Sequence, residues 1–157
     1  MKNPPVAVRL PIRYGDLDPY GHVNNAVHLM FFEEIRLSYW RALAGQIGFE
    51  DLEAGDIPGA RYVIAETTIR YKAPIFLDDT LHGAAKIRTV GNRSYVMDFE
   101  LRTGESFAEG SLACEGSAAH VFFDPISAEV QPRPDWFLPA VAGLEDRPEE
   151  SFVPEDS

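Results

Sequence analysis

The fold is decided by one stretch of sequence, in which a polar turn leads into an apolar run. The turn reads Tyr14-Gly15-Asp16-Leu17-Asp18-Pro19-Tyr20-Gly21-His22-Val23-Asn24-Asn25, and the apolar run extends from Ala26 to Ala44. Two acids, a histidine and two amides are crowded into a segment that glycine and proline allow to turn. A helix N-terminus behind such a turn is a place where a reacting anion is stabilised. We therefore predict that residues 14–25 form the active site.

The apolar run predicts a long central helix. Asn24 is a favourable N-cap residue, and Gly45 and Gly48 can end the helix. Side chains that recur at helical spacing form one apolar face: Phe31, Phe32, Ile35, Tyr39, Ala42 and Leu43. More apolar side chains spread over the remaining surface: Leu29, Met30, Leu37 and Trp40. A helix this apolar is expected to lie at the centre of the fold with other elements around it.

Alternating apolar and polar residues predict strands before and after this helix. Residues 6–14 alternate despite Pro11, which indicates a sheet edge or a bulge. After a loop with at most one helical turn over residues 49–60, strands are expected to residue 123, with turn signals at Asp78-Asp79 and Gly91-Asn92. An order of strand, long helix and four strands predicts an α+β fold, in which one antiparallel β-sheet is wrapped around one long central α-helix.

The bulk composition fits one globular domain. The chain has 157 residues, of which 45% are hydrophobic and 25% charged, and this is enough for a single core. The formal net charge of −11 and only 14 lysines and arginines argue against a nucleic-acid partner, because a phosphate binder needs a clustered basic surface. An anionic small molecule is still compatible, since residues 143–157 alone contain six acids and one arginine.

The cellular location is predicted from what the sequence lacks. Its single cysteine, Cys114, cannot form an intrachain disulfide and is expected to be a small core residue. Residues 1–5 have no apolar segment of the signal-peptide type, and no apolar run reaches the roughly 18 residues of a membrane span. We expect a cytoplasmic protein without a membrane span.

The C-terminal segment differs from the rest of the chain. Prolines recur from residue 132 onward, and the apolar periodicity ends. Trp136 and Phe137 are expected to pack against the body of the protein, whereas residues 143–157 are acidic and poor in large apolar side chains. The prediction is therefore a single domain over residues 1–137 and an acidic, disordered tail over residues 138–157.

These motifs resemble those of a known family. The segment from Arg13 to Asn25, followed by an aromatic helix with Phe32-Glu33-Glu34, resembles the signature of hotdog-fold acyl-CoA thioesterases of the 4-hydroxybenzoyl-CoA thioesterase type. Residues 66–74 and 78–81 resemble the family's long central strand and the turn after it, and residues 91–95 resemble its hairpin. The resemblance covers residues 6–137 in the family's order and implies the hotdog fold.

The resemblance also implies hydrolysis of a thioester between an acyl group and coenzyme A. Asp18, the second acid of the Asp-x-Asp turn, would be the catalytic carboxylate that attacks the carbonyl or activates a water. The backbone N–H of Asn25, in the first turn of the helix, would polarise the carbonyl oxygen. His22 is a further catalytic candidate, which either titrates in the reaction or hydrogen-bonds the turn. No metal or cofactor is implied, since a thioester has a good leaving group and coenzyme A is part of the substrate.

Three substrate-binding residues are implied by the resemblance: Arg93, Ser94 and Tyr20. The family places basic residues at the hairpin to meet the phosphates of coenzyme A, although Arg93 alone is typical of a solvated hairpin charge. We expect a homodimer or a homotetramer, because one curled sheet leaves its edges and one flank of the helix uncovered.

Other roles are open for several polar side chains of the signature. Asp16 can simply hold the turn. Glu33 and Glu34 are typical of a solvated helix face, although another hotdog branch uses a helix glutamate as its catalytic acid. Four side chains could in principle bind a metal, but their spacing matches no defined metal motif: Asp16, Asp18, His22 and His28.

Two other functions are compatible with the same sequence. The Asp-Leu-Asp…His-Val-Asn-Asn string also resembles plant acyl-ACP thioesterases, so acyl carrier protein could carry the acyl group. A non-catalytic hotdog module that binds an acyl thioester would keep the fold without the chemistry. The presence of Asp18 favours an enzyme over the binding module.

Overall fold

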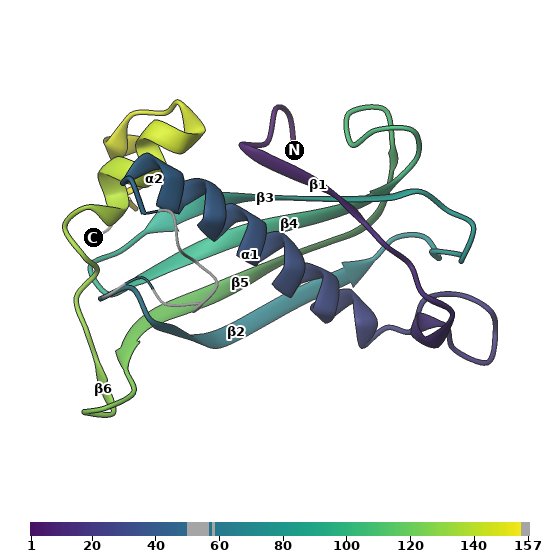
Figure 1. Cartoon of the computed structure of the whole chain (residues 1–157), viewed down its shortest axis with the longest axis horizontal. Helices are drawn as coiled ribbons and strands as arrows, with labels where there is room; N and C mark the ends of the chain where they lie inside the picture. Colours follow the sequence, from purple (N-terminus) through teal and green to yellow (C-terminus); the bar gives the residue numbers. More distant parts are fainter. Residues whose placement is uncertain (50–56, 58, 155–157) are drawn as a thin grey trace. The chain divides into compact units, whose positions relative to one another are not determined.

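The computed structural model describes residues 1–49, 57 and 59–154. It contains ten elements in chain order, drawn in Figure 1: β1 Val6–Leu10, η1 Tyr14–Asp16, α1 Val27–Gln46, β2 Tyr62–Tyr71, β3 Leu81–Val90, β4 Ser94–Thr103, β5 Ser111–Asp124, β6 Glu129–Val130, α2 Phe137–Glu145 and η2 Glu149–Phe152. The predicted order of strand, long helix and four further strands is confirmed. The loop predicted over residues 49–60 falls largely outside the described residues.

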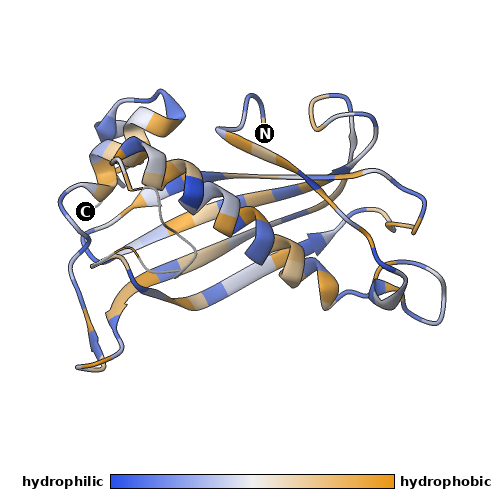
Figure 2. Cartoon of the chain, in the orientation of Figure 1, coloured by the Kyte–Doolittle hydropathy of each residue, from blue (hydrophilic) through white to orange (hydrophobic). Residues whose placement is uncertain are grey.

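The strands form one antiparallel sheet in the order β1-β3-β4-β5-β2, with the short β6 paired to β5. The helix α1 packs against this sheet. Strands β1 and β3 pair so that Val6 lies opposite Ala85 and Leu10 opposite Leu81. Figure 2 shows both hydrophobic and hydrophilic stretches along the strands, and along β4 buried and partly exposed residues alternate, as a sheet with one buried face requires. The predicted α+β architecture is therefore confirmed.

The first strand is shorter than the alternation of residues 6–14 predicted. It ends at Leu10, directly before Pro11, which has no N–H to donate to a sheet ladder. The chain then tightens into η1, where Asp16 accepts a hydrogen bond from the N–H of Arg13 at 2.8 Å. A local side-chain bond thus replaces the strand pairing that the alternation suggested.

The chain forms two compact units, and each takes part of α1 and part of the sheet: residues 1–39, 69–86 and 99–116 in the first, and residues 40–68, 87–98 and 117–157 in the second. In the first unit the rings of Phe32 and Phe99 stack with centroids 4.6 Å apart. Gly83 lies under Ile35, whose side chain would overlap a Cβ at that position. The close approach of α1 to β3 in this unit therefore requires glycine.

The second unit has an aromatic core. The Trp40 Nε1 donates to the hydroxyl of Tyr95 at 3.2 Å, and the Tyr62 and Phe137 rings both lie 5.7 Å from the Trp40 ring. Phe137 also lies 5.0 Å from Tyr95. The predicted packing of Phe137 against the body of the protein is confirmed, because its side chain is completely buried.

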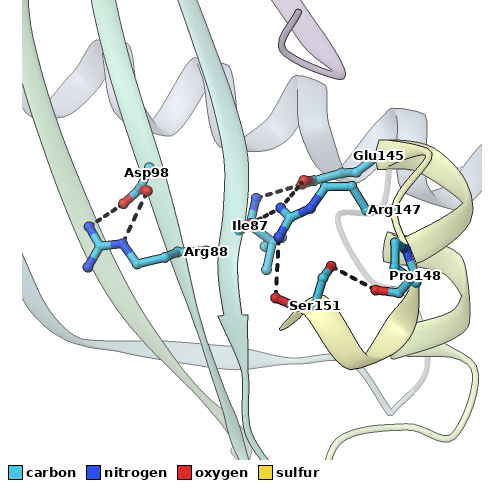
Figure 3. A network of polar contacts seen from close by, with 7 residues as sticks. All are labelled: Ile87, Arg88, Asp98, Glu145, Arg147, Pro148 and Ser151. Carbon is cyan, nitrogen blue, oxygen red and sulfur yellow. Dashed lines mark hydrogen bonds and ion pairs between the residues drawn. The ribbon is translucent and has the colours of Figure 1, made fainter. Parts of the chain in front are cut away.

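The prediction of a disordered tail over residues 138–157 is wrong for the residues up to 154, which the structure folds into α2 and η2. Phe152 is completely buried, and the Arg147 guanidinium lies 4.1 Å from its ring centroid. A Glu145 carboxylate oxygen accepts a hydrogen bond from the N–H of Ile87 at 2.6 Å (Figure 3). The prediction failed because it was based on the acidic composition of the segment and did not consider that a few apolar residues, such as Phe152, could be buried. Residues 155–157 lie outside the described part of the chain.

The helix α1 is not surrounded on every side. Its predicted face is buried at Phe31, Phe32, Ile35, Tyr39 and Leu43. Leu29, Met30 and Leu37 are exposed instead, which leaves an apolar flank along the helix. Within the described residues, no helix is both long and apolar enough to cross a membrane.

Candidate active site

The polar turn is held together by Asp16. Its carboxylate is almost completely buried and lies 3.2 Å from the Arg13 guanidinium, in addition to accepting the Arg13 N–H. The backbone C=O of Asp16 accepts the N–H of Asn24 at 2.8 Å, which closes the turn. Asp16 therefore has the structural role that the sequence left open, and none of the described hydrogen bonds directs it at a substrate.

The Asp18 carboxylate is held by two contacts within the turn. One oxygen, Oδ1, accepts the N–H of Tyr20 at 2.9 Å, and Oδ2 lies 3.1 Å from Nδ1 of His22. A carboxylate oxygen only accepts, so His22 carries its proton on Nδ1 when it makes this contact. Each oxygen keeps a further lone pair for another partner, and the side chain is 17% exposed.

The backbone of the same turn supports this arrangement. Asp18 donates its N–H to the C=O of His22 at 2.9 Å and accepts the N–H of Gly21 at 3.1 Å. Gly21 has φ +87°, a left-handed conformation that a side chain would disfavour. The N–H of Val23 donates to the C=O of Ile75 at 2.8 Å, which anchors the turn to the segment after β2. The acid and the histidine are therefore fixed by backbone contacts on both sides.

The start of the helix follows the predicted cap. Asn24 accepts the N–H of Ala26 on Oδ1 at 2.9 Å and the N–H of Val27 on its C=O at 3.0 Å. The helix begins at Val27, so Asn25 lies in the turn before the first helical residue and not, as predicted, in the first turn of the helix. Among the residues that the structure describes, none accepts a hydrogen bond from the N–H of Asn25.

A pocket of about 600 Å³ brings most of the predicted residues together. Four of its lining residues were predicted from the sequence: Asp18, Tyr20, His22 and Asn25. The others come from the turn, from α1 and from the end of β2 and the residues after it: Val23, His28, Tyr71, Lys72, Ala73 and Pro74. The pocket therefore combines one acid, one unpaired backbone donor and several apolar surfaces.

Two of the pocket residues that were not predicted as parts of the active site contact backbone carbonyls of the turn. The Tyr71 hydroxyl donates to the C=O of Asn25 at 3.0 Å, and Nδ1 of His28 lies 3.1 Å from the C=O of Asn24. Burial lowers the pKa of His28 below its usual value, and burial raises that of the Tyr71 hydroxyl. His28 could have been found because it lies in the first turn of the predicted helix, four residues after the cap residue Asn24. The contact of Tyr71 has no local sequence signal, because 46 residues separate it from Asn25.

The remaining predicted residues lie in the second unit. Arg93 is exposed in the turn between β3 and β4, and its C=O accepts the N–H of Phe122 at 2.9 Å. Ser94 begins β4 and accepts the N–H of Gly91 on its C=O at 2.8 Å. The bond between Gly91 and Ser94 closes the predicted hairpin, whereas the side-chain roles of Arg93 and Ser94 stay predictions.

The helix glutamate and the metal cluster that the sequence left open receive no geometric support. Glu33 pairs with Arg36 at 2.5 Å, and its side chain is 55% exposed. It is not among the residues that line the pocket. Within the described ranges, no group of three or more histidine, cysteine, aspartate or glutamate side chains is arranged to hold a metal ion.

Comparisons with known proteins agree with this fold. The family model of the thioesterase-like superfamily matches residues 12–141. The long-chain acyl-CoA thioesterase FadM of Escherichia coli is 30% identical over 89 residues, which cover 57% of this chain and 63% of that enzyme. The chain therefore spans less than two thirds of the length of this curated relative.

Solved structures extend the similarity over nearly the whole chain. A Thermus thermophilus thioesterase, solved with coenzyme A and zinc, is 30% identical with a TM-score of 0.77, covering 94% of this chain and 99% of that one. A Pseudomonas aeruginosa protein is 26% identical with a TM-score of 0.70, covering 87% of this chain and 97% of that one. On these grounds, and with an antiparallel sheet packed on one long helix, the chain belongs to the thioesterase-like superfamily and has its hotdog fold.

Proposed function

We propose that the protein hydrolyses an acyl-CoA thioester to a free carboxylic acid and coenzyme A. One observation carries the proposal: Asp18 and Asn25 line the same pocket, and within the described residues the N–H of Asn25 has no hydrogen-bond partner. Acyl transfer needs two groups: a nucleophile or general base for the attack on the carbonyl carbon, and a hydrogen-bond donor for the carbonyl oxygen. The Escherichia coli and Thermus thermophilus relatives, by their names, act on or bind molecules of this class.

Asp18 can perform the attack by either of two routes. As a nucleophile, its oxygen bonds to the thioester carbon, the C–S bond breaks, and the thiolate leaves and takes up a proton. Water then hydrolyses the mixed anhydride and restores the carboxylate. As a general base, Asp18 takes a proton from a water molecule whose oxygen attacks the same carbon. Both routes yield one acid and one thiol from one thioester and one water.

The Asn25 N–H stabilises the negative charge that develops on the carbonyl oxygen. Asn25 lies two residues before the first residue of α1, where the unpaired N–H groups of a helix start add a positive field. Removing one such donor from an enzyme costs roughly 100- to 1000-fold in rate. Because this donor polarises the carbonyl and the thiolate is a good leaving group, the proposed reaction needs no metal ion and no cofactor.

His22 orients the carboxylate in this mechanism. Its Nδ1 contact fixes Oδ2 of Asp18, and its ring lies 6.4 Å from that of Tyr20 and 6.5 Å from that of Phe76. We extend the proposal to three substrate contacts: Tyr20 in the pocket, and Arg93 and Ser94 at the hairpin. Arg93 would pair with a phosphate of coenzyme A.

We also propose that the protein works as a homodimer or homotetramer. In the described part of the chain, β2 is the last strand on one side of the sheet. Val63 and Ile64 on this strand are 43% and 41% exposed, and nearly all of its ten residues are at least partly open to solvent. A long, apolar edge strand is a template for pairing, so a second copy of β2 would cover it.

The test is thiol release from a panel of acyl-CoAs and acyl carrier protein thioesters, followed with a free-thiol reagent. Release from acyl-CoAs supports the proposal. Release from acyl carrier protein thioesters alone would show that the carrier is a protein. If calorimetry shows that acyl-CoA binds but no thiol is released, the chain is a binding module and the proposed hydrolysis is refuted.

A further inference from the structure

The two peptide units on either side of Asn25 offer four polar groups, and three of them are hydrogen-bonded. The C=O of Asn24 accepts both the N–H of Val27 at 3.0 Å and the Nδ1 of His28 at 3.1 Å. The C=O of Asn25 accepts the Tyr71 hydroxyl at 3.0 Å, and the N–H of Ala26 donates to Oδ1 of Asn24 at 2.9 Å. Within the described residues, only the N–H of Asn25 has no partner.

These bonds determine the direction of that N–H. A peptide unit is planar and trans, so its C=O and its N–H point in opposite directions. The N–H of Asn25 belongs to the same unit as the C=O of Asn24, and the two bonds on that carbonyl therefore aim it. The next peptide unit, between Asn25 and Ala26, is fixed by its hydrogen bonds with the Tyr71 hydroxyl and with Oδ1 of Asn24. With both flanking planes held, φ and ψ of Asn25 are fixed as well.

The protonation states of His28 and Tyr71 allow both side chains to donate hydrogen bonds to these carbonyls. A backbone C=O only accepts hydrogen bonds, so the proton of His28 lies on Nδ1. Burial lowers the pKa of His28, which keeps its ring neutral at pH 7, and the raised pKa of Tyr71 keeps its hydroxyl protonated. The two rings pack edge to face, with centroids 4.9 Å apart and an interplanar angle of 88°. Each side chain therefore limits the movement of the other.

We propose that His28 and Tyr71 are positioning residues that hold the Asn25 N–H toward the thioester carbonyl oxygen. The bond from His28 also polarises the shared peptide unit, which strengthens the N–H as a donor. This inference rests on the proposed function, because it concerns the same reaction and the same donor. It assigns a role in catalysis to two side chains that do not touch the reacting atoms.

The kinetic test uses variants that remove or keep single hydrogen bonds. Tyr71→Phe removes only the hydroxyl, and His28→Leu removes the Nδ1 donor. His28→Asn is the matched control, because its amide nitrogen can occupy the place of Nδ1. We expect Tyr71→Phe and His28→Leu to lower kcat about tenfold with KM changed less than about twofold, as loss of a transition-state contact requires. His28→Asn should recover most of the lost kcat. Asn25→Pro deletes the N–H itself, so its loss of kcat should be the largest of the series.

A second readout measures the hydrogen bond directly. Dodecanoyl-CoA labelled with carbon-13 at the thioester carbonyl is bound to each variant in an Asp18→Asn background, and the carbonyl stretch is recorded by infrared spectroscopy. A red shift in the background protein that shrinks with Tyr71→Phe and His28→Leu, and returns with His28→Asn, supports the inference. Unchanged kcat and an unchanged carbonyl frequency in both variants would overturn it.

The two proposals fail in different ways. A wild type that binds dodecanoyl-CoA but hydrolyses no thioester refutes the proposed function, and the infrared comparison then still decides whether His28 and Tyr71 aim the donor. A wild type that binds neither acyl-CoA nor an acyl carrier protein thioester refutes both. Circular dichroism of each variant confirms that its fold is retained before its kinetics are compared.

Discussion

Nδ1 of His22 lies 3.1 Å from Oδ2 of Asp18, four residues earlier in the same turn. The other carboxylate oxygen is held by the N–H of Tyr20. The acid is thus fixed by one side-chain donor and one backbone donor, and it keeps free lone pairs toward the pocket. In the proposed mechanism, Asp18 is the residue that reacts and His22 is the residue that orients it.

His22→Leu should lower kcat about tenfold, because the carboxylate loses the contact that orients it. His22→Asn places an amide donor near the position of Nδ1 and should recover much of the rate. Steady-state kinetics of the two variants tests this. Equal rates for both would show that the hydrogen bond has no part in the reaction.

Asp18→Asn should lower kcat at least about a hundredfold, since it removes the charge that attacks or activates water while it keeps the size of the side chain. Binding of acyl-CoA should survive. Asp16→Asn should mainly lower the midpoint of thermal unfolding, because Asp16 is buried against Arg13 and holds the turn. An inactive Asp16→Asn beside a fully active Asp18→Asn would mean that the catalytic acid is Asp16.

Arg93→Ala should raise KM for acyl-CoA more than it lowers kcat, because a phosphate contact remote from the carbonyl acts equally on the ground state and the transition state. The effect should shrink as salt is added. Lys2→Ala, which removes the charge of another exposed basic residue, is the control for net charge. Equal KM values for Arg93→Ala and wild type at low salt would remove Arg93 from the binding site.

Phe152→Ala should destabilise the protein by about 3–5 kcal/mol, the cost typical of emptying a fully buried aromatic site. The neighbouring Val153 is exposed, so Val153→Ala should change the free energy of unfolding by less than about 0.5 kcal/mol. Urea unfolding followed by fluorescence measures both. Similar small effects for the two variants would show that η2 does not pack against the rest of the protein. The disordered tail predicted from the sequence would then be correct.

Ile64→Lys should dissociate the proposed dimer, because it places a charge on the edge strand β2 that a second copy would have to bury. Ile126→Lys puts the same charge on a residue that is 90% exposed in the turn after β5, and it should leave the mass unchanged. Light scattering at micromolar concentration compares the two with wild type. A wild type with the mass of one chain would refute the assembly before any variant is needed.

The predicted elements that the structure confirms depend on local contacts. The cap at Asn24, the turn around Asp18 and the helix behind it are made by residues within a few positions of one another, so periodicity and turn chemistry find them. The same is true of the hairpin at Gly91 and Ser94. The residue types in these segments favour the observed backbone through contacts within each segment.

What only the tertiary structure decided depends on residues far apart in sequence. Tyr71 reaches the carbonyl of Asn25 across 46 positions, and Glu145 reaches the N–H of Ile87 across 58. No periodicity encodes such pairs, because they form only once the strands are packed and the buried polar groups must find partners. The acidic composition of residues 138–157 likewise predicted disorder and gave no weight to Phe152. One buried aromatic ring can hold a short segment against the protein even when its charged residues favour solvent.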